Sequence, residues 1–410
     1  MYVVRTVRFE SGEQLPLLCK ASHAEPVLLP LIYFVLRRRH KSVNTIRRDA
    51  SVLKWLYEWA EGFHNVDLDA ELASGHFEII IDKLDQFSFW LRSGRNAVNI
   101  AGRIGKPSSK DWLHPRTFND YLHTVQLYLL WVIDRYTKST NSSNLNRHLT
   151  EIKNRINSKF DASVLGGSTE ISVKGLEPEH VAMLLEITHV DAHRNPFCRN
   201  VRLRNWLIFK ILLETGLRRG ELLKLKTTDI NEENDQFYLT IKRRPDDPTD
   251  SRSIQPAQKT LSRTVSISEH LYQGIEKYIL TERRPKNAGK KITIKHQFLF
   301  TSERGSPLGL SAVNYAFSII QKEVFSELGI EFHPHLLRNT FCNNYLEWCV
   351  EKQGMSLQQA LDELRQICGW QLSSNMPLRY GAKWINKQAN EHNFNRVNAA
   401  ISRFHRGAAK

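Results

Sequence analysis

The sequence has no apolar run long enough to cross a membrane. Its longest, VLLPLIYFVL at residues 27–36, is about half of the ~20 residues that a membrane span needs, and it is followed by RRRHK. The first residues, MYVVRTVRFESGE, carry charges where a signal peptide would need an apolar core. We therefore expect a soluble, cytoplasmic protein that has no membrane partner.

Cysteines spaced for a disulfide framework are also missing. The chain has 5 cysteines, an odd number, and none of them stands in a CxxC motif. Such a set is typical of reduced thiols in an intracellular protein. The five are Cys19, Cys198, Cys342, Cys349 and Cys368.

Motifs for nucleotides and metals are absent as well. The chain has no GxxxxGKS/T loop and no acidic cluster of the kind that two-metal nucleases use. His189, His193 and Cys198 resemble part of a metal site, but a clear fourth ligand is missing, and the stretch fits a polar helix end better. We therefore expect neither a cofactor nor a metal.

The excess of positive charge points to a polyanionic partner. Lys and Arg number 58 against 43 Asp and Glu, which gives a net charge of +15. Such a charge favours nucleic acid through phosphate contacts and counterion release, although many basic proteins bind none. The length of 410 residues and the 41% hydrophobic content predict two or three packed domains rather than a disordered chain.

The first part of the chain predicts a helical domain with a small β-hairpin at its start. YVVRTVRFESGEQLPLLC alternates around an SGE turn, and residues 42–62 and 116–136 have helical periodicity. The helix over 42–62 pairs an apolar stripe with a basic face, which suits DNA docking or an ordinary solvated surface. The stripe is Ile46, Ala50, Leu53, Leu56 and Tyr57; the basic face is Arg47, Arg48 and Lys54.

A break in the periodicity divides the chain. Residues 158–175 contain a Gly pair and small polar residues, as exposed linkers do. Beyond them, QFYLTIKR and SRTVSIS alternate as two antiparallel strands joined by a long polar connection, and the rest is helical. The predicted fold is mainly α with a small antiparallel β-sheet: a helical domain at 1–160, a linker at 161–174 and an α+β domain at 175–410.

Four short segments of the second domain carry side chains suited to phosphate chemistry. In ETGLRRGELLKL, Arg218 lies at a break between helices, where it could grip an anion or simply pair with Glu221. Lys259 lies near the start of the second strand, where a lysine is commonplace. Alone, neither segment decides between a functional and a structural role.

The other two segments lie nearer the end of the chain. HPHLLRNTFCNNYLEWC predicts a helix beginning at Pro334 that leaves His335 and Arg338 one turn apart; a structural His and a surface Arg fit equally well. In ICGWQLSSNMPLRYGAKW, Gly369 ends a helix and Pro377 starts the last one, which carries Tyr380, a candidate nucleophile or a half-buried core residue. The apolar stripe of the first helix is predicted as Leu337, Phe341, Tyr345 and Trp348.

Taken in order, the four segments resemble the catalytic set of the tyrosine recombinases, the phage integrase family, over roughly residues 175–390. TGLRRGELLKL is similar to the family's arginine box, which makes Arg218 its arginine and Glu221 a supporting acid, and leaves Arg219 as a solvated side chain. HPHLLRNTF is similar to the family's H-x-L-R motif. The resemblance implies the catalytic residues Arg218, Lys259 as general acid, His335, Arg338, Trp370 and Tyr380 as nucleophile.

The resemblance also implies an activity and partners. The family's chemistry is transesterification on DNA through a 3′-phosphotyrosyl intermediate, so the chain is expected to be a site-specific recombinase of a mobile genetic element, associated with the bacterial nucleoid. Its first domain would be the core-binding DNA clamp. Its partners would be double-stranded DNA and further copies of the chain, in a homotetramer that holds two DNA sites and exchanges C-terminal helices. A requirement for accessory proteins is left open. The alternatives to a recombinase are an inactive architectural relative and a type IB topoisomerase-like enzyme. The alternative to helix exchange is a C-terminal helix packed on its own domain.

Overall fold

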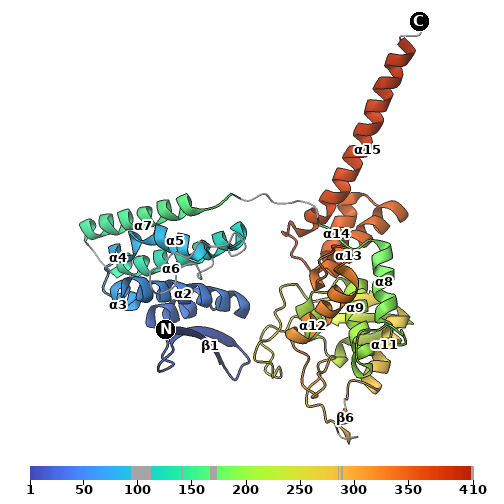
Figure 1. Cartoon of the computed structure of the whole chain (residues 1–410), viewed down its shortest axis with the longest axis horizontal. Helices are drawn as coiled ribbons and strands as arrows, with labels where there is room; N and C mark the ends of the chain where they lie inside the picture. The colour runs from blue at the N-terminus through green and yellow to red at the C-terminus, as the bar shows by residue number, and fades with distance from the viewer. Residues whose placement is uncertain (94–111, 140–141, 167–172, 285, 288–289, 408–410) are drawn as a thin grey trace. The chain divides into compact units, whose positions relative to one another are not determined.

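The chain folds into two compact units, Met1–Thr169 and Glu170–Lys410. Each unit has its own hydrophobic core. None of the helices in the described ranges is both long enough and apolar enough to span a membrane. The computed structural model describes residues 1–93, 112–139, 142–166, 173–284, 286–287 and 290–407 (Figure 1).

The first unit begins with the expected hairpin and is otherwise helical. Strand β1 (Tyr2–Arg8) pairs antiparallel with β2 (Gln14–Lys20), so that Tyr2 lies opposite Lys20. The hairpin packs on α2, and β2 is buried along nearly its whole length. The helices of this unit are α1 (Leu28–Tyr33), α2 (Val43–His64), α3 (Leu68–Ala73), α4 (Glu78–Ile81), α5 (Leu84–Arg92), α6 (Pro115–Ser139) and α7 (Ser143–Ser163).

Helix α2 confirms the helix expected over residues 42–62. Ser42 caps it by accepting a hydrogen bond from the backbone N–H of Thr45, and Asn65 ends it in a left-handed conformation. The whole predicted apolar stripe is buried, as is that of α6. The buried residues of the two stripes are Ile46, Ala50, Leu53, Leu56 and Tyr57 on α2, and Phe118, Leu122, Val125, Leu129 and Val132 on α6.

Helix α7 continues further than the sequence periodicity suggested. It runs to Ser163, into the stretch that was expected to be a linker from residue 158 onward. Phe160 is buried in the core of the first unit, and burying that ring stabilises the last turn of the helix. The Gly pair at 166–167 follows this helix end, and residues 167–172 lie outside the described part of the chain.

The second unit has a small sheet set among helices. Its three antiparallel strands lie in the order β3 (Ile230–Glu233), β4 (Gln236–Ile241) and β5 (Arg263–Ile267). The predicted pair β4–β5 is present, with Leu239 opposite Val265; β3 was not predicted, and β6 (Lys286–Asn287) with β7 (Lys290–Lys291) forms a further short pair. The helices are α8 (Pro178–Thr188), α9 (Arg202–Thr215), α10 (Arg219–Lys224), α11 (Glu269–Leu280), α12 (Leu310–Ile320), α13 (Pro334–Glu347), α14 (Leu357–Ile367) and α15 (Met376–Gly407).

The face that α13 buries differs from the predicted stripe. Trp348 is 52% exposed, whereas Cys342 and Leu346 are buried. The reason is that α13 lies between two clusters of core residues: Leu336 and Leu337 belong to the main core of the unit, and the residues one to two turns later belong to a smaller cluster with α14. A single-stripe pattern therefore could not describe this helix.

Helix α15 projects from the second unit as a long single helix (Figure 1). Its first turns pack on α13 and α14. Further along, several large apolar side chains remain exposed, which is unusual for a helix without a partner. These exposed residues are Ile385, Phe394, Val397 and Ile401.

The core of the first unit provides a test of the fold. Leu53 is fully buried on α2, so Leu53→Ala should lower the free energy of unfolding of that unit by about 2–5 kcal/mol. Leu36→Ala is the matched control, because Leu36 is 64% exposed in the same unit. Hydrogen exchange measured by mass spectrometry should show faster exchange in peptides of the first unit for Leu53→Ala alone. Equal exchange in the two variants would contradict the assigned core.

Candidate functional site

Arg218 lies where the chain passes from α9 to α10. Gly216 ends α9 in the left-handed conformation at φ +59°, and Arg218 is the N-cap of α10. A Cβ atom at Gly216 would overlap the ring of Phe341, so a glycine here lets the end of α9 lie directly against α13. This close contact brings Arg218 to the helix that carries Arg338.

Arg338 is fully buried between the end of α9 and the end of α14. Its Nη1 donates to the carbonyl oxygen of Gly216, and its Nη2 donates to that of Cys368 at 3.1 Å. Its guanidinium carbon lies 4.9 Å from the centre of the Trp370 ring. The sequence placed His335 and Arg338 on one common face; the structure instead leaves His335 exposed and buries Arg338 completely.

The two arginines have hydrogen-bond donors that no described group accepts. Nη1 of Arg218 and Nε of Arg338 are both buried and have no partner among the described residues. Burial, followed by repulsion from Arg338, lowers the pKa of Arg218. Buried donors are normally satisfied, so two such donors on adjacent cations indicate a site for an anion that accepts hydrogen bonds.

Glu221 connects these arginines to the sheet. Its carboxylate is fully buried and accepts from the backbone N–H of Arg218 at 2.7 Å, from Nη1 of Arg263 at 2.7 Å and from the hydroxyl of Thr260. Burial favours the protonated acid, but the charge and hydrogen bonds of Arg263 outweigh it, so the pKa of Glu221 is lowered. The ion pair expected between Glu221 and Arg218 is thus replaced by one with Arg263, and Arg218 contributes only its backbone.

Lys259 lies on the long connection between β4 and β5, just before β5. Its side chain is exposed and has no hydrogen bond or ion pair with a described residue. The connection lies against α10, because a Cβ atom at Gly220 would collide with the carbonyl oxygen of Ala257. Lys259 is therefore tethered near the turn that carries Arg218, with an unengaged ammonium group.

His335 lies in the first turn of α13, after Pro334. Its ring reaches solvent, yet desolvation by the surrounding atoms, followed by repulsion from Arg338 and Arg218, lowers its pKa to about 4. His335 is therefore neutral at physiological pH and can accept a proton. This shift also indicates that the imidazole lies within electrostatic range of Arg338 and Arg218, the two cations that would hold an anion.

Trp370 and Tyr380 stack on one another beside Arg338. Gly369 turns the chain at φ +63° after α14, and the rings of Trp370 and Tyr380 follow with centroids 5.6 Å apart at 23°. The indole Nε1 of Trp370 is buried without a hydrogen-bond partner among the described residues, a third unused donor next to the arginines. The structure thus places Trp370 with Arg338 and Tyr380 in one cluster.

The Tyr380 hydroxyl is turned into the protein. It donates to Oδ1 of Asn339 at 3.1 Å, and the residue is only 2% exposed. Burial, followed by the neighbouring Cys342 thiol, raises the pKa of Tyr380. In this conformation the hydroxyl is neither free nor acidic, so it must leave Asn339 before it can attack a substrate.

Arg219 and the basic residues of α2 have protein partners. Arg219 is half-buried and donates to Oδ1 of Asn314 on α12, so it is not the solvated arginine that the sequence suggested. In the first unit, Arg48 donates to Asp49 at 3.1 Å, Lys54 lies 3.6 Å from Glu58, and Arg47 donates to Asn44 at 3.1 Å. The three α2 residues therefore form a surface of paired, partly neutralised charge.

Sequence reasoning missed three residues of the cluster. Arg263 begins β5 and was not singled out, although its guanidinium donates to Glu221 and to the carbonyl oxygen of Ile367. Thr260 and Asn339 were missed for the same reason: each holds a candidate residue through a contact between distant parts of the chain. The available signal for Thr260 and Asn339 was that each is a polar residue directly beside a candidate, Lys259 or Arg338.

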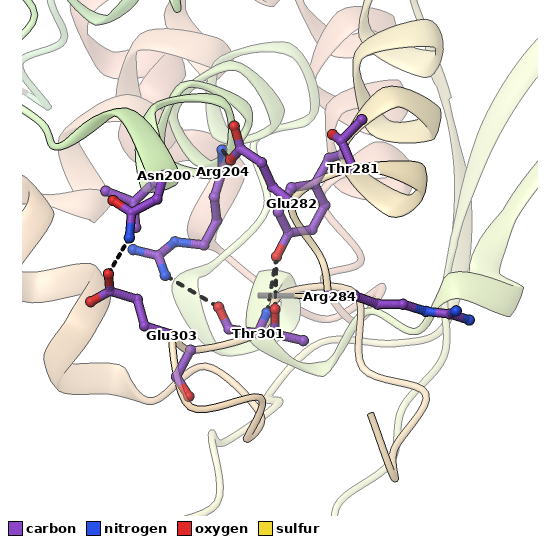
Figure 2. A pocket seen from close by; sticks show the side chains of 10 residues that line it. Asn200, Arg204, Thr281, Glu282, Arg284, Thr301 and Glu303 are labelled. Carbon is purple, nitrogen blue, oxygen red and sulfur yellow. Dashed lines mark hydrogen bonds between the residues drawn. The ribbon is translucent and has the colours of Figure 1, made fainter. Parts of the chain in front are cut away.

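A pocket of about 300 Å³ lies elsewhere in the second unit (Figure 2). It opens at the N-terminal end of α9, whereas Arg218 follows the C-terminal end of this 14-residue helix, about 21 Å away along its axis. Its polar groups pair with one another: Arg204 donates to the carbonyl oxygen of Thr301, and Asn200 to Glu303. We assign the pocket no part in the site.

Among the described residues, which include His189, His193 and Cys198, no group of three or more His, Cys, Asp or Glu side chains is placed to hold a metal ion.

The chain is similar to known proteins in sequence. Residues 175–371 match the model of the phage integrase family. The second unit therefore carries a phage integrase family domain. Relatives of the chain include transposase A of transposon Tn554 from Staphylococcus aureus, 24% identical over 77% of this chain and 78% of the relative, and tyrosine recombinase XerH from Campylobacter jejuni, 28% identical over 49% and 50%.

Two solved structures also align with much of the chain. The XerH recombinase bound to its difH substrate aligns over 86% of this chain and 88% of that chain, with 18% identity and a TM-score of 0.43. The Tn1549 transposon integrase in complex with circular intermediate DNA aligns over 80% and 94%, with 18% identity and a TM-score of 0.45.

The lowered pKa of His335 can be measured directly. In an NMR titration of histidine-labelled protein, the resonance that His335→Asn removes should titrate near pH 4 rather than 6.5. Because the folded state favours the neutral ring, the stability from this shift is complete above the unfolded pKa and declines as the pH falls from about 6.5 toward 4. A titration midpoint near 6.5 would show that the arginines do not face this imidazole.

Proposed function

We propose that this protein, which carries a phage integrase family domain, is a site-specific DNA recombinase that cuts and rejoins strands through a 3′-phosphotyrosyl intermediate. The observation that carries the proposal is the set of three unused donors on Arg218, Arg338 and Trp370, together with the Tyr380 ring that stacks on Trp370. A DNA phosphodiester is an anion whose oxygens accept hydrogen bonds, and it carries the phosphorus that a tyrosine hydroxyl attacks.

In the proposed reaction, the Tyr380 oxygen bonds to phosphorus as the bond from phosphorus to the 5′ oxygen breaks. The tyrosine proton passes to the neutral imidazole of His335, and Lys259 gives a proton to the departing 5′ oxygen. A 5′-hydroxyl of the partner strand then attacks the phosphotyrosine and restores Tyr380. The bond energy is kept throughout, so the exchange requires no nucleotide.

In this proposal the arginines stabilise the transition state. Arg218 and Arg338 hold the non-bridging oxygens and offset the charge that develops on the pentavalent phosphorus, and Trp370 adds an indole N–H donor. Glu221 keeps the backbone of Arg218 in place. Two fixed guanidinium groups supply the positive charge that a metal would supply in other phosphoryl transferases, so the proposed mechanism calls for no metal.

The buried position of Tyr380 implies a preceding step. We infer that DNA binding frees its hydroxyl from Asn339 and turns it toward the phosphate, with a shift of the first turns of α15. The hydrogen bond to one amide oxygen is a modest barrier of about 1 kcal/mol, so contacts with DNA can offset it.

DNA binding itself is assigned to both units. The net charge of +15 supports broad contact with phosphates. The first unit would act as the DNA clamp, with Arg47, Arg48 and Lys54 exchanging their present partners for the DNA backbone. The Tn554 transposase among the relatives supports a task within a mobile genetic element, and the DNA substrate supports a location at the bacterial nucleoid.

Assembly on two DNA sites is assigned to the C-terminal helix. Three exposed apolar residues of α15, Phe394, Val397 and Ile401, fall on one face of a helix that projects from its unit, and a second copy of the chain would cover them (Figure 1). We therefore propose a homotetramer in which each α15 docks on a neighbouring copy.

The adjacent arginines provide a matched test of the site. Nη1 of Arg218 is buried without an acceptor among the described residues, so Arg218→Ala should fold and bind DNA normally but form covalent adduct about 100- to 1,000-fold more slowly. Arg219→Ala is the control and should retain cleavage within a few-fold. The measurement is denaturant-resistant adduct on a nicked suicide substrate made from the element's own ends.

Tyr380→Phe completes the same experiment and should give no adduct. Adduct formation by Tyr380→Phe would assign the nucleophile to another residue. If the unaltered protein forms no adduct on a verified site, the result would indicate that the chain is a DNA-binding relative without catalytic activity.

Helix exchange makes a separate prediction. Replacing Phe394 and Ile401 together by Glu should prevent the pairing of two occupied DNA sites, because the charged side chains cannot be buried against a neighbouring copy. Binding of one copy to a single half-site should be unchanged, as the substituted residues are exposed in the isolated chain. Mass photometry separates the two species. Unaltered pairing would show that α15 does not form this interface.

A further inference from the structure

Lys259 is an exposed residue between two buried ones. Gln258 is 8% exposed and Thr260 is 4% exposed, and both side chains point into the protein and are hydrogen-bonded. A lysine on a polar connection would ordinarily move with it, because its four-carbon side chain is flexible and so is the loop. Here the backbone on either side of Lys259 is held.

Gln258 ties the lysine to the end of β4. Its Oε1 accepts from the backbone N–H of Arg244 at 2.6 Å, and its Nε2 donates to the carbonyl oxygen of Lys242 at 3.0 Å. The side chain thus takes the place of a neighbouring strand beyond the last paired residues of β4 and β5. Without it, two backbone groups just beyond β4 would lose their partners.

Thr260 ties the backbone that follows Lys259 to Glu221 and Arg218. Its hydroxyl donates to Oε1 of Glu221, the same carboxylate that accepts from the backbone of Arg218. A short path of two hydrogen bonds therefore connects the backbone next to Lys259 with the backbone of Arg218. The two residues are thereby kept at a defined separation, although they belong to different elements.

The rest of the connection is anchored by buried charges. Asp250 is fully buried, with Nη2 of Arg252 at 2.7 Å and Nζ of Lys224 at 3.4 Å. Arg252 also donates to the carbonyl oxygens of Leu223 and Leu308, and Gln255 accepts from Lys224. The connection is longer than a hairpin needs, yet it is fastened to α10 rather than free.

We propose that Gln258 and Thr260 are positioning residues that hold Lys259 where its ammonium group can protonate the departing 5′ oxygen. This inference rests on the proposed function, in which Lys259 is the general acid. It assigns to the two flanking residues a task that neither would have in a merely solvated loop. The reason is geometric: a proton donor must lie within hydrogen-bond reach of its acceptor, and a misplacement of about 1 Å can cost about 100-fold in rate.

The test replaces the leaving oxygen by sulfur. In a suicide substrate with a 5′-bridging phosphorothiolate, the leaving group is a thiolate, which departs without a proton because thiols are far more acidic than alcohols. A variant that impairs only proton donation should therefore be slow on the oxygen substrate and normal on the sulfur substrate. A variant that damages the site in general should be slow on both.

Thr260→Val is the main variant, since it removes one hydroxyl and keeps the shape of the side chain. Thr260→Ser restores the hydroxyl, and Thr264→Val makes the same change at an exposed position of β5. We expect full-length Thr260→Val to cleave the oxygen substrate about 10- to 100-fold more slowly, and the sulfur substrate within about twofold of the unaltered protein. Thr260→Ser and Thr264→Val should be near normal on both.

The remaining arms separate this inference from the proposed function. Lys259→Ala should be rescued by sulfur; if it is not, the assignment of Lys259 as general acid fails. If Lys259→Ala is rescued but Thr260→Val is either normal on oxygen or slow on both substrates, the positioning inference fails. Gln258→Met, which loses both hydrogen bonds at similar size, tests the other flank with the same readout and keeps the inference falsifiable if Thr260→Val does not fold.

Discussion

The buried carboxylate of Glu221 is the contact on which the arrangement of the site depends. A fully buried charge is costly unless it is paired and hydrogen-bonded, and Glu221 meets both conditions through groups from two segments: Arg218 on its own turn, and Thr260 with Arg263 at the start of β5. Because no single segment could satisfy it, the carboxylate favours the packing that brings the two together. Arg263 continues the connection to the end of α14, next to Trp370.

The second unit organises positive charge in two different ways. Around Asp250, the cations Lys224 and Arg252 are neutralised by a buried acid, so they fasten the long connection and are not available to a ligand. Around Arg218 and Arg338, one acid 3.9 Å from Arg338 is shared with Arg263, and donors are left over. The difference in pairing, rather than in residue type, distinguishes an anchoring cluster from an anion site.

Much of this fold could be predicted because helix and strand signals are local. The stripes of α2 and α6 and the helix ends at Gly216 and Pro334 follow from spacing and backbone preference. The buried face of α13 could not be predicted from spacing, since it depends on two clusters of core residues that only the tertiary structure creates. Arg218 and Arg338 were paired through the family resemblance alone, because residues far apart in sequence come close only in the folded chain. The roles of Thr260 and Asn339 likewise depend on hydrogen bonds between distant segments. The spacing of residues in the sequence did not decide whether Tyr380 is buried.

The stacked and hydrogen-bonded Tyr380 has a consequence for the fidelity of recombination. On the proposed mechanism, every DNA segment must supply the free energy that moves this ring off Trp370 and Asn339 before any strand can break. A cognate site, with its larger set of contacts, can meet that threshold, whereas a segment bound only through its phosphates has less binding energy to spare. A protein that scans a genome by electrostatic attraction would thus free Tyr380 less often on the DNA that it merely visits.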